Sequence, residues 1–392
     1  MMKRLSRNLA SAAVIAVAVT GATTVRADDD NFKGQRNAYL VNKLVSDQAK
    51  VANFQDPVLR NAWGVAFSPA ASPFWIADNA SGCSTLYDGT GVKAALQVPI
   101  PLPDNSVPST ACQPPASAQT NPPPPTPAAP TGLVWNPTTT FLVPGTSTAA
   151  PFIFATEDGT ISAWANGVKP NNQAIIAVDN STSGAVYKGL VFGTNPRGVF
   201  LFATNFNAGR IDVFAPNGSA GFRPATSQEV EGNFTDAKIP AGFAPFGIEN
   251  IDGNLFVSYA KQNAAKHDDV AGPGNGFVDV FDTDGNLLRR FASRGPLNSP
   301  WGMTRASFAF GRFSGLILIG NFGNGKINVF TSQGQFIDEL DRSNGKPLVI
   351  DGLWKLILGG GRNSSSDTLY FTAGPNDETN GLFGTITPAS KQ

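Results

Sequence analysis

One hairpin-like motif occurs twice in this chain and constrains its fold more than any other feature. The segment LILIGNFGNGKINVF, Leu316 to Phe330, closely matches FLFATNFNAGRIDVF, Phe200 to Phe214. Each copy contains an apolar run, an Asn-Phe pair, a glycine, one basic residue and then alternating apolar and polar residues that end at Phe. Because alternation with period two is typical of a half-buried strand, each copy predicts two antiparallel β-strands.

Four looser copies raise the number of repeats to six. They begin at Phe74, Phe152, Leu255 and Thr368. A second short strand precedes every copy, and its signature is a glycine followed by an aliphatic residue. These glycines are Gly64, Gly132, Gly189, Gly247, Gly302 and Gly352.

Six units of about 55 residues, each with three or four strands, predict an all-β fold, a six-bladed β-propeller. One unit cannot bury the faces of its own sheet, whereas a closed ring of six units can. The composition agrees, because 41 Gly, 30 Pro and only 15% charged residues suit short strands joined by turns better than long helices.

The two ends of the repeat indicate how the ring closes. The last unit runs out at Leu382–Pro388 without an outer strand, whereas Ala38–Asp47 reads as a strand without a partner of its own. We therefore expect the N-terminal strand to complete the sixth blade. The predicted organisation is a single propeller from residue 38 to 388, preceded by a flexible segment at 28–37 and followed by a tail at 389–392.

The first 27 residues have the three parts of a secretory signal peptide. MMKRLSRN is basic, LASAAVIAVAVTGA is apolar, and VRA before Asp28 has the small-x-small pattern that signal peptidase accepts. The alternative is a transmembrane anchor, but an apolar run of about fourteen residues is short for a span of about 20. We expect cleavage near Ala27 and export to the periplasm or the extracellular space, without a membrane anchor.

The charge of the mature chain bears on its partners. Cleavage would remove four basic residues and leave 25 basic against 29 acidic ones. No basic block remains to follow a phosphate backbone, so nucleic acid is not an expected partner. We expect a monomer.

Two cysteines, Cys83 and Cys112, lie within the predicted propeller. In an oxidising compartment such a pair is more often bridged than free, so we predict a disulfide. Two buried thiols are the alternative. In the chain-entropy model, the bridge would stabilise the fold by roughly 3–4 kcal/mol.

Two long loops are predicted on one face of the ring. The Pro-rich segment at about 99–130 is expected to be a surface insertion between the first two blades, and a linker between two domains is the alternative. The second loop, at about 260–276, carries His267 beside Asp268 and Asp269. This histidine is either a general base or metal ligand, or part of a solvated loop tip.

The repeat signatures also resemble a known family. N-x-W-G before an apolar strand, (I/V)-A-D-N at the end of the next strand and G-(R/K)-I-x-V-F in the third resemble the NHL-type propeller repeat. From about residue 38 to 388, the chain resembles a family of exported NHL-like propellers of uncharacterised activity. It is more distantly similar to gluconolactonase- and regucalcin-like hydrolases. This second resemblance implies a cluster of carboxylates and amides that holds a metal ion at the mouth of the central channel, where the ion would activate water.

Oxygen-bearing side chains at the ends of the second strands are the candidate ligand-binding residues. The full set is Asp78, Asn79, Glu157, Asn205 and Asn321, with Glu249 and Asn250 from the fourth unit. Four of them form a candidate calcium site, because Ca²⁺ prefers hard oxygen ligands. These four are Asp78, Asn205, Glu249 and Asn321. The alternative role of the Asn and Asp side chains is to cap tight turns.

Glu249 is the best single candidate for a catalytic residue. It lies on a predicted innermost strand, where the other units have an uncharged residue. The residues at that position are Ala66, Val134, Val191 and Thr304.

Three classes of function remain open. We favour a binding or scaffold module that presents the loop-rich face and the channel mouth to a protein, a peptide or a glycan. The alternative is a calcium-dependent lactone or ester hydrolase, and the third class is a structural component of the envelope or matrix. A single histidine excludes multi-histidine zinc sites, and no G-x-S-x-G motif is present. No cofactor is called for beyond the candidate calcium ion.

Overall fold

The computed structural model describes residues 36–69, 71–115, 125–168, 170 and 172–389. The predicted signal peptide lies outside the described residues. So do most of the predicted flexible segment, part of the Pro-rich insertion and the end of the tail. The described residues contain β-strands and short 3₁₀ helices, and no α-helix.

The strands form six sheets, which we number as blades in chain order; all strand pairs are antiparallel except β1 with β2. Blade 1 contains β3 (Ala62–Ala66), β4 (Phe74–Asp78), β5 (Cys83–Tyr87) and β6 (Val98–Pro99). Blade 2 contains β7 (Pro130–Trp135), β8 (Phe152–Thr156), β9 (Thr160–Trp164) and β10 (Ile175–Asp179). Blade 3 contains β11 (Tyr187–Asn195), β12 (Gly198–Asn205), β13 (Arg210–Pro216) and β14 (Phe222–Pro224).

The remaining blades follow the same pattern. Blade 4 contains β15 (Phe243–Ile251), β16 (Asn254–Lys261), β17 (Phe277–Phe281) and β18 (Leu287–Ser293). Blade 5 contains β19 (Pro300–Arg305), β20 (Ile317–Asn321), β21 (Ile327–Phe330) and β22 (Phe336–Glu339). Blade 6 contains β23 (Leu353–Leu358), β24 (Leu369–Ala373), β25 (Leu382–Pro388), β1 (Tyr39–Ser46) and β2 (Phe54–Gln55). Short 3₁₀ helices span Asn79–Ser81, Ser181–Ser183 and Gly311–Phe313.

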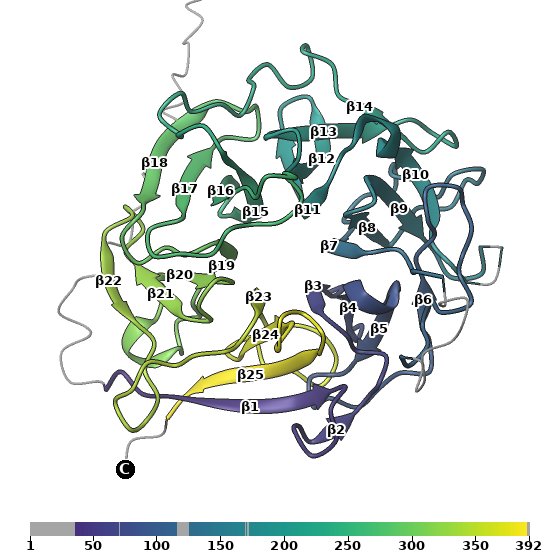
Figure 1. Ribbon diagram of the computed structural model, residues 1–392. Coiled ribbons are helices and arrows are strands. Elements are labelled where there is room, and N and C mark those ends of the chain that lie inside the picture. The colour runs from purple at the N-terminus through teal and green to yellow at the C-terminus, as the bar shows by residue number, and fades with distance from the viewer. Residues whose placement is uncertain (1–35, 70, 116–124, 169, 171, 390–392) are drawn as a thin grey trace, which may run out of the picture. The chain divides into compact units, whose positions relative to one another are not determined.

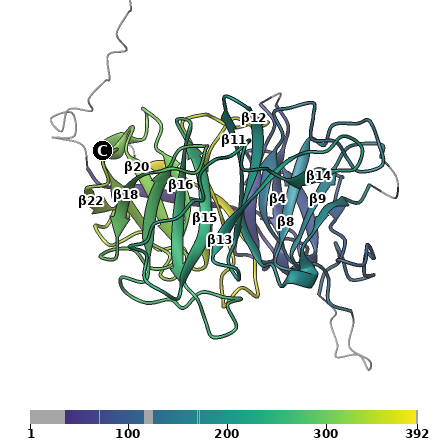
Figure 2. The same cartoon turned by 90° about the horizontal axis from the view of Figure 1, so that it is seen from above.

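The blades stand around a central axis and form the predicted six-bladed propeller (Figure 1). Each innermost strand contacts that of the next blade, in the order β3, β7, β11, β15, β19, β23 and back to β3. Seen edge-on, the strands run between the two faces of the ring (Figure 2).

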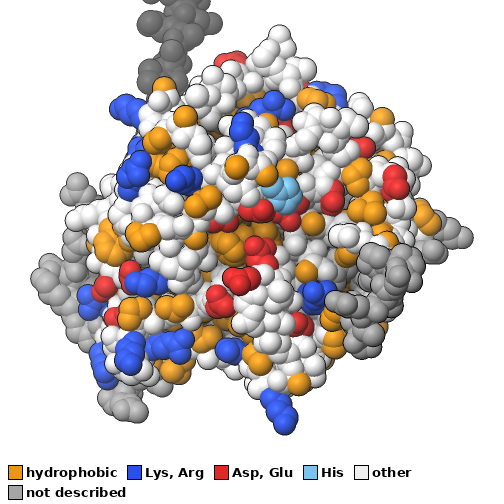
Figure 3. Space-filling model, viewed as in Figure 1, with side chains coloured by type: hydrophobic (Ala, Val, Ile, Leu, Met, Phe, Trp, Pro, Cys, Tyr) orange, Lys and Arg blue, Asp and Glu red, His pale blue; other side chains and the backbone are white. Residues whose placement is uncertain are grey.

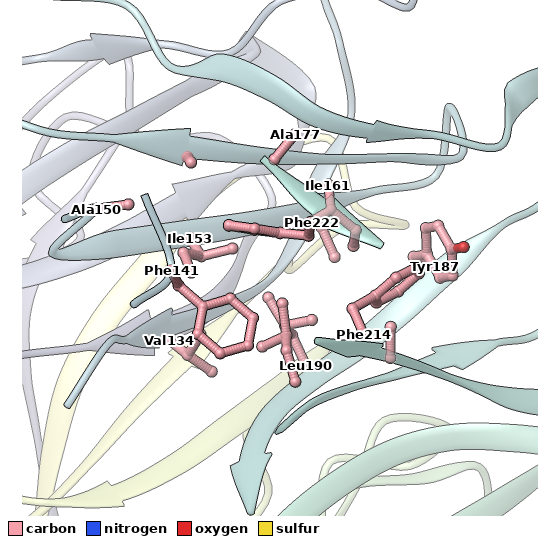
Figure 4. Packing of buried hydrophobic residues seen from close by; sticks show 14 of the residues in the cluster. Val134, Phe141, Ala150, Ile153, Ile161, Ala177, Tyr187, Leu190, Phe214 and Phe222 are labelled. Atoms are coloured by element: carbon pink, nitrogen blue, oxygen red, sulfur yellow. The ribbon is translucent and has the colours of Figure 1, made fainter. Parts of the chain in front are cut away.

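Apolar side chains between neighbouring sheets form the core. Between blades 2 and 3, Ile153 and Ile161 pack with Tyr187, Leu190 and Phe214 (Figure 4). The period-two alternation of the sequence places such residues on the faces that meet the next blade.

The ring closes as predicted, through the N-terminal strand. β1 pairs antiparallel with β25, from Tyr39 opposite Pro388 to Ser46 opposite Leu382. The sixth blade thus combines strands from the beginning and the end of the described chain.

The predicted signature of the sixth unit is wrong by three residues. Strand register aligns Leu353 with Ala62, so Lys355 occupies the position of Gly64 and Leu356 that of Val65. The glycine is needed in other blades because the next blade comes very close. A Cβ atom at Gly64, Gly247 or Gly302 would lie closer than 3.0 Å to the backbone of the neighbouring innermost strand.

A hydroxyl group on the second strand links neighbouring blades at three of the six joints. In blade 3, Thr204 accepts from the Gly189 N–H (2.7 Å) and donates to the Phe246 carbonyl of blade 4 (2.8 Å). Ser258 repeats this arrangement between blades 4 and 5, and Thr372 repeats it between blades 6 and 1.

Cys83 on β5 and Cys112 form the predicted disulfide, with their Cα atoms 5.0 Å apart. The Cys112 N–H also donates to the Ser81 carbonyl at 2.9 Å, which fastens the described part of the insertion to the β4–β5 turn. Such a bond is typical of an oxidising compartment. A search of the described residues for a helix of sufficient length and apolarity to cross a membrane finds none.

Candidate functional site: the acidic mouth of the channel

Aromatic side chains close the central channel where the innermost strands begin. This aromatic plug consists of Trp63, Phe206, Phe246, Trp301, Phe322 and Trp354. Trp63 stacks on Trp354 with 3.6 Å between ring centroids. The ring centroids of Phe246 and Trp354 lie 5.9 Å apart, although blade 5 stands between the strands that carry them. The rings of the plug therefore meet near the axis.

Lys188 is the second residue of β11, at the position where four other blades have an aromatic residue of the plug. Its ammonium group lies 5.0 Å from the centroid of the Trp63 ring and 5.8 Å from that of Phe206. Only 2% of its side chain is exposed. The ammonium group is paired with Glu157 and lies 3.7 Å from the carboxylate of Asp268. These partners matter because a buried charge is costly unless it is paired.

Acidic side chains surround this lysine on the loop-rich face. We define the acidic mouth as Glu157, Lys188, His267, Asp268, Asp269 and Glu378. Figure 3 shows the histidine and several carboxylates around a hollow with apolar side chains at the centre of this face. The side chains come from loops of blades 2, 4 and 6 and from the first strand of blade 3.

His267 and Asp268 form a pair at the rim of the mouth. The Nδ1 atom of His267 lies 2.7 Å from Oδ1 of Asp268. This hydrogen bond raises the pKa of His267 and lowers that of Asp268. The histidine is therefore held in the loop by a carboxylate, and its protonated form is favoured.

A chain of side-chain hydrogen bonds connects blades 6, 1 and 2 across the mouth. Asn61 donates to Glu378 (2.7 Å) and to Asn79 (3.1 Å), and Asn79 donates to Glu157 (2.9 Å). Burial raises the pKa of Glu378 to about 7, opposed by the hydrogen bond from Asn61 and assisted by the charge of Glu157. Burial likewise raises the pKa of Asp269.

The structure brings two of the predicted ligand-binding residues, Asn79 and Glu157, together in this mouth. Three others have partners within their own blades. Asp78 is fully buried, it accepts from the Thr85 N–H (2.9 Å), and burial raises its pKa. Asn205 and Asn321 accept hydrogen bonds from backbone N–H groups of adjacent turns at 3.2 and 3.1 Å.

Glu249 and Asn250 lie further along β15, beyond the plug. Glu249 pairs with Lys355 of β23. Asn250 donates to the Phe192 carbonyl at 3.0 Å. In the part of the chain that the structure describes, no hydrogen bond or ion pair joins Glu249 to the other members of the candidate calcium set, so that set remains a prediction.

A different group of side chains places metal-ligating atoms close together. Glu157, His267 and Asp268 each offer one such atom, and these atoms lie within 4.8 Å of one another. However, the Lys188 ammonium is paired with Glu157 and close to Asp268. Two cations in so small a site repel each other, so these residues do not fit a divalent ion while Lys188 remains in place.

Sequence reasoning missed Lys188, Asn61 and Glu378. Lys188 could have been found, because it precedes a repeat glycine where other units have Trp63, Phe246 or Trp301. Glu378 gives no comparable signal, since it lies in a polar turn segment, PNDETNG, in which charged residues are common.

No protein-family model matches the chain. Among solved structures, a streptogramin B lyase is 12% identical with a TM-score of 0.48, covering 90% of this chain and 98% of its own. The gluconolactonase XC5397 from Xanthomonas campestris is 14% identical with a TM-score of 0.45, covering 84% of this chain and 86% of its own. These values are too low to transfer a reaction or a residue role.

Sequence similarity identifies nearer relatives, from Acanthamoeba polyphaga mimivirus. "Uncharacterized protein L690" is 30% identical over 353 residues, which are 89% of this chain and 85% of the relative. "Uncharacterized protein R648" is 29% identical over 353 residues, which are 89% of this chain and 80% of the relative. The alignment with the first covers most of both chains, and this chain therefore belongs to the same family as this mimivirus protein.

Proposed function

We propose that this protein is an exported binding module, and that the acidic mouth binds a positively charged group of a peptide or protein. The observation that carries the proposal is the convergence of Glu157, Asp268, Asp269 and Glu378 from three blades around one buried lysine. Carboxylates gathered in this way repel one another, and groups with perturbed pKa values cluster at functional sites.

The charge balance favours a cationic ligand. Four carboxylates face Lys188 and His267, so the mouth keeps an excess of negative charge whenever Glu378 is ionised. A lysine or arginine side chain would relieve this repulsion and gain charge-assisted hydrogen bonds. The long loops on the same face would supply further contact area.

Binding of trilysine and trialanine to the mature chain, measured by calorimetry at low and high salt, tests this proposal. We expect saturable binding of trilysine alone, weakened by salt. The Asp268→Asn/Glu378→Gln variant should bind at least about tenfold more weakly. Asp252→Asn is the matched control, because Asp252 is 64% exposed on a turn of β15–β16. No binding of trilysine, or an equal loss in the control variant, contradicts the proposal.

A metal-dependent hydrolase is the second candidate, because ligand atoms of Glu157, His267 and Asp268 lie within 4.8 Å of one another, although the Lys188 ammonium opposes a divalent ion there. Elemental analysis and titration with calcium and zinc chloride would separate the two. We expect the wild-type protein to bind neither ion tightly, and Lys188→Met to gain affinity for one. A stoichiometric ion in the wild-type protein would replace the binding proposal by the hydrolase, with lactones and esters as the substrates to screen.

Export rests on the predicted signal peptide and agrees with the Cys83–Cys112 disulfide. Expression of the full chain followed by mass spectrometry of the exported fraction tests it. The expected product begins at Asp28, is oxidised and is monomeric in solution. A full-length product that remains inside the cell with two alkylatable thiols contradicts it.

A further inference from the structure

A cavity lies on the side of the aromatic plug that is opposite the acidic mouth. It has a volume of about 220 Å³ and is lined by the innermost strands of blades 1, 2, 3, 4 and 6 and the residues that follow them. Because these strands run from the acidic mouth toward the opposite face, their later residues line this lower pocket. The walls are mainly apolar, with Phe67, Trp135 and Phe192 as aromatic components.

Two departures from the repeat meet in this pocket. Glu249 stands where strand register places Ala66, Val134, Val191 and other uncharged residues. Lys355 stands where the other blades have a glycine. The two charged groups pair across the channel, from blade 4 to blade 6, which are not neighbours in the ring.

The propeller fold needs neither charge, since five other blades close without them. An ion pair in an apolar pocket adds little stability compared with well-packed apolar residues. Its position at the wall of a cavity points to a polar contact with a bound molecule.

The pair leaves one hydrogen-bond acceptor available. Glu249 Oε2 bonds the Lys355 ammonium, which also lies 5.9 Å from the ring centroid of Trp301. In the described residues, no hydrogen bond reaches the other carboxylate oxygen of Glu249, and 24% of this side chain is exposed, against 13% for Lys355. A ligand would therefore meet an acceptor first.

We propose that the lower pocket binds a small, uncharged, mainly apolar molecule that carries one hydrogen-bond donor, such as a phenol or an alcohol. Its hydroxyl group would donate to Glu249, and its ring or chain would pack against Phe67, Trp135 and Phe192. A charged ligand is disfavoured because the Glu249–Lys355 pair is already neutral, and an additional charge would be unbalanced among apolar walls.

The test uses p-cresol, toluene, benzoate and benzylammonium as probes of the mature protein. Their binding is followed by NMR of the indole N–H of Trp135, assigned with a Trp135→Phe variant. We expect p-cresol to shift this signal saturably and to bind at least tenfold more tightly than the other three. Absence of saturable binding by p-cresol, or equal binding of benzoate or benzylammonium, overturns the proposal.

Variants separate the polar contact from simple filling of space. Glu249→Leu/Lys355→Leu keeps the pocket neutral, and p-cresol should then bind no more tightly than toluene. An unchanged preference for p-cresol in this folded variant overturns the role of Glu249. Asp268→Asn at the mouth should leave p-cresol binding unchanged, so the proposal stands or falls independently of peptide binding at the acidic mouth.

Discussion

The sixth blade differs from the other five in the way its strands are brought together. Blades 1 to 5 are each made from one continuous segment, whereas blade 6 joins β23–β25 to β1 and β2. It alone carries Lys355 at the glycine position. Its β24–β25 loop, with Asn376, Asp377 and Glu378 at positive φ, places a half-buried carboxyl group at the acidic mouth. Several departures from the repeat therefore occur in the blade that closes the ring, while Lys188 and Glu249 depart from it in blades 3 and 4.

Loss of β1 should have the largest effect on the stability of the ring, because β1 is the strand of blade 6 that joins the two ends of the propeller. Truncation of residues 1–47 should lower the melting temperature by more than about 10 °C or abolish cooperative unfolding. Truncation of residues 1–35 is the control, since it leaves all β1–β25 pairs of the described chain intact. Equal melting temperatures for the two truncations would mean that blade 6 does not depend on its fourth strand.

The glycine position offers a sharper comparison of blade 6 with blade 5. Gly302→Ala should lower the free energy of unfolding by about 2–3 kcal/mol, because its Cβ would overlap the backbone of Trp354. In a Glu249→Gln background, Lys355→Ala should cost under about 1 kcal/mol, since a side chain already has room there. Urea denaturation measures both values, and a similar cost at the two positions would refute the difference between the joints.

The half-buried carboxyl group of Glu378 in blade 6 predicts a dependence of stability on pH. The pKa of Glu378 rises from 4.5 to about 7 on folding, so the folded state binds more protons between these values. Stability should therefore fall as the pH rises from 4.5 through 7, by an amount on the order of 2 kcal/mol. Glu378→Gln should remove this part of the slope in urea melts, whereas Asp377→Asn, in the same loop, should retain it.

The hydroxyl contacts give the smallest expected effect. Thr372→Val at the joint of blades 6 and 1, and Thr204→Val at that of blades 3 and 4, each remove one bridging hydroxyl. Each should lower the free energy of unfolding by about 1 kcal/mol. If only Thr204→Val has an effect, the closing joint is looser than an internal one.

The propeller could be predicted from the sequence because the strand pattern that produces it repeats along the chain. Six copies of one strand pattern specify six blades. The missing outer strand of the last unit and the unpartnered strand at 38–47 specify their closure, without reference to side-chain contacts. The sixth signature was misaligned because Gly352 lies three residues before the position that Lys355 occupies. Only the strand register reveals that this position takes a side chain in one blade.

The candidate site could be predicted only in part. Asn79 and Glu157 were expected at the mouth from their positions at strand ends. Local turn geometry decides which residues at the strand ends point into the mouth. It gives the side chains of Asn205 and Asn321 backbone N–H partners rather than partners in the mouth. The positive charge contributed by Lys188 was unforeseen, and it changes the chemistry expected of the surrounding carboxylates.

The pairing of β1 with β25 has a consequence for the order of events during biosynthesis. β1 is the first described strand to emerge from the ribosome, and its partner is the last. Blades 1 to 5 can form as their segments appear, but the first strand must wait until all of them have been made. An unpaired strand edge invites misassociation, so assembly of this ring is most vulnerable until β25 has been made.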